Sequence, residues 1–391
     1  MIRGWLTDEG LRLFFPAAAI HGALWPLVWV VLYQLDLPLA RAIPVTQWHA
    51  HEMIFGTYGM ALAGFLTSAV PEWTGTQRWR GRNLLILLAL WLPGRLAGLF
   101  GADILAAPTA ITDALFLAGL AWAVISPMLA RRSTRHSSFA VWALLFLLCE
   151  IAIRIAWLMG DFTLSGRLLH AALAIFLVFF ALSVARINVV VINLALDPSG
   201  ETTPYRPHPG RQNLAAGLVS LYVVALLALP GSQAPAYLAL AAAAAFFDRL
   251  AEWFIGRAVL RAEVLALMTA NAMAGIGFGV IGLSGLGFGL MESTGLHLLS
   301  MGSLGMAVIS VFVIAGLRHT GRRLILPAAA HVALILMLAA ALMRTLPELG
   351  VFSALVGPHY AIGALLWAGA FAAWLHGFLP FMTAPGLSEE A

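Results

Sequence analysis

The chain has 391 residues, of which 61% are hydrophobic and only 10% are charged. Soluble globular domains carry about 25% charged residues, so this composition excludes a water-soluble fold. All 22 basic residues are arginine and Cys149 is the single cysteine, which together exclude lysine Schiff-base chemistry, disulfides, iron–sulfur clusters, thiolate zinc sites and the attachment of c-type haem. The arginines are scattered between apolar runs, so the net charge of +4 does not indicate a nucleic-acid partner.

Apolar runs separated by short polar breaks extend along the whole chain. A transmembrane helix needs about 20 apolar residues, and the hydrophobic content is enough for about twelve such helices. The sequence therefore predicts an all-α integral membrane protein with about twelve transmembrane helices. In chain order, the predicted spans are 13–33, 48–70, 84–102, 110–130, 138–159, 168–195, 214–230, 236–256, 263–284, 293–317, 324–343 and 359–380.

The breaks between the spans alternate in arginine content. One set holds Arg41, Arg167 and Arg344, whereas the other holds fifteen arginines. Because cytoplasmic loops are enriched in arginine, we expect the rich set and both chain termini to lie in the cytoplasm. No cleavable signal peptide is evident. The rich set consists of Arg3, Arg12, Arg78, Arg80, Arg82, Arg131, Arg132, Arg135, Arg206, Arg211, Arg257, Arg261, Arg318, Arg322 and Arg323.

A cytoplasmic loop rich in proline and turn-forming residues, 197–213, divides the predicted spans into six and six. We expect one polytopic membrane domain, 1–391, without a soluble domain. The division is similar to that of transporters built from two halves. No convincing repeat between the halves is evident from the sequence.

The predicted topology assigns a depth to each histidine. Five of the 11 histidines lie near the outer, periplasmic face and are candidate metal ligands: His49, His51, His170, His297 and His359. Ionisable groups within a membrane are costly and often functional. The alternative interpretation is that these are interfacial side chains at the depth of the lipid headgroups.

The densest polar cluster runs from Trp48 to Met53. Imidazole, carboxylate and thioether groups are ligand types for haem iron and copper. Residues two apart in a regular helix point about 200° apart, so His49 and His51 cannot both bind one ion unless the segment is not helical. Otherwise they serve two sites, or one is a ligand and the other a hydrogen-bond partner. Regular spacing places His49 on one face with Glu52 and Met53.

Other charged residues within the spans need partners. Glu150 and Arg154 are four residues apart and are expected to pair on one helix face. Buried arginine keeps its proton and must meet a carboxylate, a carbonyl or an anionic cofactor group. Arg186 is a candidate to face the propionates of a haem, although pairing between helices is the simpler role for such charges. Further intramembrane charges are Arg95, Asp113, Asp248, Arg249 and Glu252.

Glycines are concentrated between Gly275 and Gly289. The segment from Gly277 to Gly282 matches the GxGxxG spacing, but no strand precedes it, so the dinucleotide interpretation fails its structural context. Close helix packing or a break in the helix is the better interpretation.

Four stretches of the chain resemble the NnrS family of bacterial membrane proteins. WHAHEMIFG (Trp48–Gly56) is followed by AGFLTSAVPEWTG (Ala63–Gly75), which is similar to the family's AGFLLTAVPNWTG. Gly94–Ala97 resembles its GRLA, and HLLSMG (His297–Gly302) with HTGR (His319–Arg322) resembles its HALTVGAIG…GHTGR. The resemblance implies a multi-pass protein of the bacterial inner (cytoplasmic) membrane that takes part in the nitric-oxide response and contains haem b and copper. The residues that it carries over are His49, His51, Glu52, Met53, Arg95, His297 and His319–Arg322.

The chain departs from the family pattern at three places. Glu72 replaces the asparagine of NWTG, and Ile314 stands where an arginine precedes HTGR. The ninth span lacks a histidine-containing run, and Met268, Asn271 and Met273 lie in that region as substitute ligands.

Three functions follow from the sequence. In the first, His297 and His49 or His51 bind haem b, with copper nearby. Arg95, Arg186 and Met53 then contact the cofactor, and Glu52 is the candidate proton donor for nitric oxide reduction by an unidentified electron donor; a variant of this function binds nitric oxide without turnover. The second is a transporter of a metal or small solute, and the third is an assembly or protective factor for denitrification enzymes.

Overall fold

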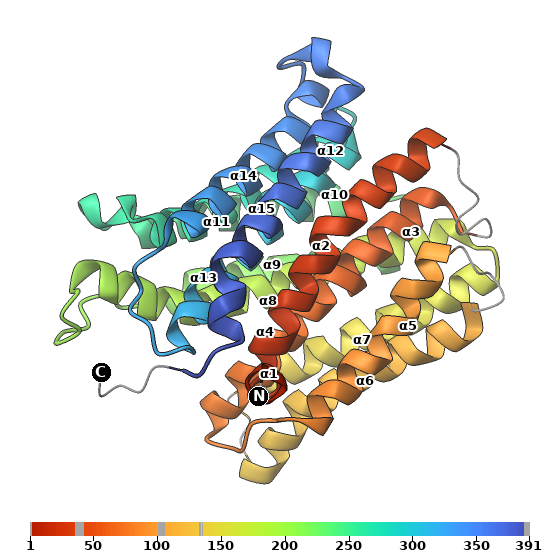
Figure 1. Ribbon diagram of the computed structural model, residues 1–391. Helices are drawn as coiled ribbons and strands as arrows, with labels where there is room; N and C mark the ends of the chain where they lie inside the picture. Colours follow the sequence, from red (N-terminus) through yellow and green to blue (C-terminus); the bar gives the residue numbers. More distant parts are fainter. Residues whose placement is uncertain (1, 36–42, 101–105, 133, 135, 387–391) are drawn as a thin grey trace. The chain divides into compact units, whose positions relative to one another are not determined.

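The computed structural model describes residues 2–35, 43–100, 106–132, 134 and 136–386, and no strand occurs among them (Figure 1). The predicted all-α fold class is thereby confirmed. The chain forms two compact units. Unit 1 comprises Met1–Ala172, Ala315–Leu324 and Phe371–Ala391, and unit 2 comprises Leu173–Ile314 and Ile325–Ala370. Because the boundaries fall within helices, α8 (Phe162–Leu196), α13 (Met306–Arg318) and α15 (Pro358–Met382) contribute residues to both units.

Unit 1 is built from the helices of the first five predicted spans. The helix α2 packs against η1 and α4, whereas α6 packs against α4, α5 and α7. Besides parts of α8, α13 and α15, the elements of unit 1 are α1 (Ile2–Leu6), α2 (Gly10–Leu35), α3 (Val45–His51), the π-helix η1 (Glu52–Tyr58), α4 (Gly59–Thr74), α5 (Arg82–Phe100), α6 (Ala106–Arg131) and α7 (Ser137–Leu158).

Unit 2 holds most of the second half of the chain. The helix α11 lies at its centre and packs against α10, α12 and η5. Besides parts of α8, α13 and α15, the elements of unit 2 are α9 (Pro209–Ala228), α10 (Ala234–Arg249), η3 (Leu250–Trp253), η4 (Gly256–Leu260), α11 (Ala262–Gly285), α12 (Glu292–His297), the π-helix η5 (Leu298–Gly305), α14 (Ala328–Thr345), η6 (Pro347–Leu349) and η7 (Ser353–Leu355).

Eleven helical stretches among the described residues are long and apolar enough to cross a membrane. They coincide with eleven of the twelve predicted spans. The third prediction, 84–102, overlaps α5 but ends among residues outside the described ranges. Arg41 and Arg135, which entered the topology prediction, also lie outside these ranges. The number twelve and the cytoplasmic termini therefore stay predictions.

Two of the membrane-length stretches contain a π-helix. Val45–Thr74 runs without interruption through α3, η1 and α4, and Glu292–Arg318 runs through α12, η5 and α13. A π-helix pairs residue i with residue i+5, is rare, and occurs mainly near functional sites. Both π-helices begin directly after a histidine that the sequence selects as a metal ligand, His51 and His297.

The glycine-rich stretch forms the end of α11, as its predicted role in close helix packing requires. A Cβ atom placed on Gly282 would lie 2.8 Å from the carbonyl oxygen of Ala236 and 2.6 Å from Leu240. The backbones of α10 and α11 therefore approach one another at a point that no larger residue can occupy. The helix ends at Gly285, and Gly287 and Gly289 follow with positive φ angles of 85° and 73°.

We predict that Gly282→Ala destabilises the protein by about 1–3 kcal/mol, because the added methyl group meets backbone that cannot move aside. Thermal unfolding of the purified protein in detergent measures the effect. Gly217→Ala is the matched control, since Gly217 also lies within a helix but has no atom within 4 Å of a Cβ position. Equal melting temperatures for the two variants would refute the close approach.

Candidate functional site

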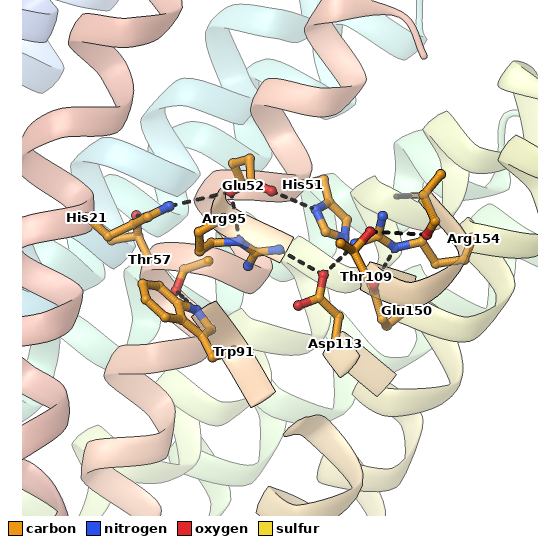
Figure 2. Close-up of polar contacts among 12 residues, drawn as sticks. His21, His51, Glu52, Thr57, Trp91, Arg95, Thr109, Asp113, Glu150 and Arg154 are labelled. Atoms are coloured by element: carbon orange, nitrogen blue, oxygen red, sulfur yellow. Dashed lines mark hydrogen bonds and ion pairs between the residues drawn. The ribbon is translucent and has the colours of Figure 1, made fainter. Parts of the chain in front are cut away.

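A closed ring of six charged side chains lies inside unit 1 (Figure 2). Carboxylates alternate with nitrogen groups around it, and none of the six side chains is more than 16% exposed. The closest nitrogen–oxygen distances are 3.0 Å for Glu52–Arg95, 2.8 Å for Arg95–Asp113, 2.5 Å for Asp113–Arg154, 2.7 Å for Arg154–Glu150, 2.7 Å for Glu150–His51 and 3.5 Å for His51–Glu52.

The alternation of charge makes this arrangement stable in an apolar interior. An isolated buried ion costs several kcal/mol, and breaking a buried pair typically costs about 3–5 kcal/mol. Each member of the ring has an oppositely charged group on both sides. Both nitrogens of His51 face carboxylate oxygens, which only accept hydrogen bonds, so this imidazole donates on both sides. Three carboxylates thus alternate with two guanidinium groups and one imidazole.

Two local features of the sequence build one half of the ring. Glu150 and Arg154 pair along α7 at the four-residue spacing, as predicted. On α5, a Cβ atom at Gly94 would lie within 2.7 Å of both carboxylate oxygens of Asp113, so only glycine admits this carboxylate. The next residue, Arg95, pairs with the same carboxylate. In the GRLA stretch, Gly94 therefore leaves space for the Asp113 carboxylate and Arg95 forms an ion pair with it.

The π-helix η1 also brings His21 of α2 into contact with Glu52, a member of the ring. In a π-helix, residues five apart lie on the same face, so Glu52 and Thr57 are aligned. His21 contacts both, with Nε2 at 3.4 Å from Glu52 Oε2 and Nδ1 at 2.8 Å from Thr57 Oγ1. Trp91 donates a hydrogen bond to the carbonyl oxygen of Gly56 within the same π-helix, at 3.1 Å. The sequence did not select His21, because no regular spacing links it to Glu52.

The WHAHEM cluster divides between two environments. His49 stacks on Trp29, with ring centroids 4.6 Å apart, whereas His51 enters the ring, so the two imidazoles separate as their spacing predicts. Glu52 contacts His51, a neighbour that regular α-helical spacing places on a different face. Met53 packs against the apolar cluster of Trp25, Leu32 and Trp48.

The ring does not fit a metal ion. One ligand atom each from His51, Asp113 and Glu150 lie within 4.8 Å of one another, which is a spacing suitable for coordination. However, Arg154 contacts both carboxylates, and Arg95 contacts Asp113. The two guanidinium groups already supply the positive charge that an ion would bring. Arg95 pairs with the carboxylates of Glu52 and Asp113.

The remaining histidine candidates with described hydrogen bonds lie in unit 2. His297 is half-buried, and its Nδ1 lies 2.7 Å from the carbonyl oxygen of Ser293. Because a carbonyl only accepts, Nδ1 carries the proton and Nε2 presents its lone pair. His359 is fully buried; its Nδ1 accepts from the Gly357 backbone N–H at 3.0 Å, and its Nε2 faces Glu348 at 3.4 Å. Both nitrogens of His359 are therefore used in structural contacts.

Other selected residues are spread over both units. His170 and Arg186 are half-buried on α8, in unit 1 and unit 2 respectively. Arg249 is fully buried in unit 2, donates to the Ala181 carbonyl oxygen at 2.9 Å and lies 3.4 Å from Glu252. This pair joins α10, η3 and α8, in keeping with the predicted pairing of such charges. Asp248 pairs with Arg211 at 3.2 Å in an exposed position.

The HTGR stretch contributes a second ionic cluster to unit 1. His319 Nδ1 and Arg78 Nη1 lie 2.8 Å and 2.9 Å from the carboxylate of Glu9. Burial raises the pKa of Glu9, but the hydrogen bond from His319 and the charges of His319, Arg78 and Arg12 outweigh it and hold this pKa below its usual value. Glu72, the departure from the family pattern, lies 3.6 Å from Arg78.

Taken together, the apolar helices and the compensated charges define a polytopic, all-helical membrane protein. The model of the NnrS protein family matches residues 5–385, nearly the whole length. The chain therefore belongs to the NnrS family, as its four stretches of resemblance predict. A comparison with curated proteins gives no match.

We predict that Arg95→Met destabilises the protein by about 3–5 kcal/mol, because it leaves two buried carboxylates under-compensated. Arg211→Met is the control: its pair with Asp248 is exposed, and the expected loss is at most about 1 kcal/mol. Thermal unfolding in detergent distinguishes the two, and similar losses would contradict the assigned role of the ring.

We predict that acid removes the stabilisation contributed by Glu9. Its folded-state pKa lies below the ordinary value of 4.5, so its contribution is fully present above that pH and is lost as the pH falls through the lowered pKa. Melting temperatures of the wild type and Glu9→Gln, measured from pH 6 down to about pH 3, should converge in acid. A gap that stays constant over this range would refute the assignment.

Proposed function

We propose that this protein is an inner-membrane metalloprotein of the nitric-oxide response, which binds nitric oxide at a haem b held by His297. Family membership supports the association with metal and with this response. The observation that carries the choice of residue is that His297, within the stretch that resembles the family, donates from Nδ1 to the Ser293 carbonyl. His331 makes a similar contact but lies outside the stretches of resemblance. Metal-binding histidines generally donate their second ring N–H to a carbonyl or carboxylate in this way.

The chemistry of the donor set separates His297 from the other assigned histidines. His51 and His359 use both ring nitrogens in described contacts, whereas the tautomer of His297 directs a lone pair outward from Nε2. An imidazole nitrogen in this state suits haem iron and also copper. When bound, the group supplies a coordination position for nitric oxide and its one-electron chemistry. His49 and His170 stay candidate metal ligands, and His49 is the proposed alternative to His51 as the partner of His297 on the haem.

The protein's own residues orient the ligand and balance charge. His297 lies at the junction of α12 and η5, where its main-chain partner Ser293 fixes the plane of the imidazole ring. In unit 1, the carboxylate of Glu52 lies 3.0 Å from a nitrogen of Arg95, 3.4 Å from His21 and 3.5 Å from His51, so its charge faces both imidazoles. Glu52 stays the proposed proton donor for nitric oxide reduction.

We predict that His297→Ala abolishes haem binding, measured as the loss of the Soret band in protein purified after expression with haem supply. His331→Ala is the matched control, because His331 Nδ1 makes the same type of contact with the carbonyl oxygen of Pro327, at 3.1 Å. The control variant should keep its haem.

Nitric oxide should shift the Soret band of the wild type and of His331→Ala. Haem retained at full stoichiometry in His297→Ala would reject this residue as the ligand. A wild-type protein that folds without any metal would reject the proposed function and favour the transporter. Bound metal that does not respond to nitric oxide would instead favour the assembly factor.

A further inference from the structure

Segments that are distant in the sequence meet at one end of unit 1. The loop between α4 and α5 contacts the residues before α2, since the Gly81 N–H donates to the Thr7 carbonyl oxygen at 2.8 Å. Arg131, the last residue of α6, donates to the carbonyl oxygen of Gly75 in the same loop. The HTGR stretch after α13 joins them through its ion pair with Glu9. We call the surface of these segments the arginine face: residues 7–9, 72–82, 131–132 and 318–323.

The arginine face carries a large surplus of positive charge. Its segments contain eight arginines against three carboxylates, those of Asp8, Glu9 and Glu72. Arg78 engages two of these carboxylates, at 2.9 Å from Glu9 and 3.6 Å from Glu72. Six further arginines are exposed and have no carboxylate partner among the described residues: Arg80, Arg82, Arg131, Arg132, Arg318 and Arg323.

The orientation of the protein in the membrane does not account for this surplus. Topology depends on the number of arginines in the loops, and acidic residues contribute little to it. In unit 2, arginines of the same predicted side do pair with acids, Arg211 with Asp248 at 3.2 Å and Arg261 with Glu263 at 2.9 Å. The exposed guanidinium groups of unit 1 are therefore available to an anionic partner from outside the chain.

The position of the arginine face points to a partner in the membrane surface. Arg131 and Arg318 are the last residues of two membrane-length stretches. Trp73 and Trp79 lie half-buried on the face, and Trp5 beside it is 37% exposed. Tryptophan is enriched at the boundary between membrane and water. An anion that binds these arginines therefore lies at the depth of the lipid phosphates.

We propose that the arginine face binds anionic phospholipids of the cytoplasmic leaflet through their phosphate groups. A guanidinium group donates two parallel hydrogen bonds that match the oxygens of a phosphate. Clusters of about four to eight basic residues directly beside membrane helices are typical of such recognition. The site belongs to unit 1 and is independent of the metal proposed at His297, so either proposal can fail without the other.

The test measures the melting temperature of the full-length protein in a non-ionic detergent to which phosphatidylglycerol is added. A ligand that binds only the folded state raises the melting temperature as its concentration increases. Phosphatidylglycerol should stabilise the wild type, whereas the zwitterionic phosphatidylcholine should not. The gain should shrink at high salt, because salt screens exposed charges.

The double variant Arg80→Gln/Arg82→Gln should need at least tenfold more phosphatidylglycerol for the same gain, since each arginine near an anionic surface contributes about fivefold. Arg80→Lys/Arg82→Lys keeps the charge and should keep most of the response. Arg206→Gln/Arg257→Gln is the matched control, because it removes two arginines of unit 2 that have no carboxylate partner among the described residues. This control should respond as the wild type does.

Two results would overturn the proposal: equal stabilisation by both lipids, or a glutamine variant of the arginine face that responds as the wild type does. Inorganic phosphate provides a further arm. If it stabilises the wild type as strongly as the lipid at equal concentration, the face binds a free anion and the lipid assignment is wrong. Should the glutamine variant not fold, the comparison of the two lipids at low and high salt with the wild type decides alone.

Discussion

The absence of water around buried charges is the constraint on which unit 1 depends. In an apolar interior, a carboxylate or guanidinium group persists only where protein groups replace its hydration. The ring meets this requirement with six side chains from the α3–η1 segment, α5, α6 and α7. Its members therefore fix the positions of these helices relative to one another. Gly94 is as important to this arrangement as the charges, since it provides the space for Asp113.

The sequence alone predicts the features that arise from local spacing. The apolar runs gave the helical class, the four-residue spacing gave the Glu150–Arg154 pair, and the two-residue spacing separated His49 from His51. The sequence alone did not predict the contacts between helices, because no local spacing links Arg95 to Asp113 or His21 to Glu52. The π-helices were also missed. The wider turn of a π-helix changes which residues share a face, and no single residue type indicates where a π-helix forms.

The two units use one backbone device in chemically different surroundings. In unit 1, Glu52 and Arg95 surround the histidine that precedes the π-helix with charge, and its nitrogens are consumed by carboxylates. In unit 2, Leu298 follows the histidine, and a main-chain carbonyl orients the imidazole instead. The same π-helical turn is thus surrounded by charged side chains in unit 1 and by a main-chain carbonyl and apolar residues in unit 2.

The closure of the ring has an electrical consequence. Moving one elementary charge across the whole membrane involves about 2.3 kcal/mol for each 100 mV of transmembrane potential. In a closed circuit of alternating carboxylates and nitrogen groups, each charge has opposite charge on both sides, so little net charge is left for the field to act on. An open chain of the same residues would leave groups of opposite sign uncompensated at its ends. Unit 1 can therefore hold this ring in a polarised membrane with little response to voltage.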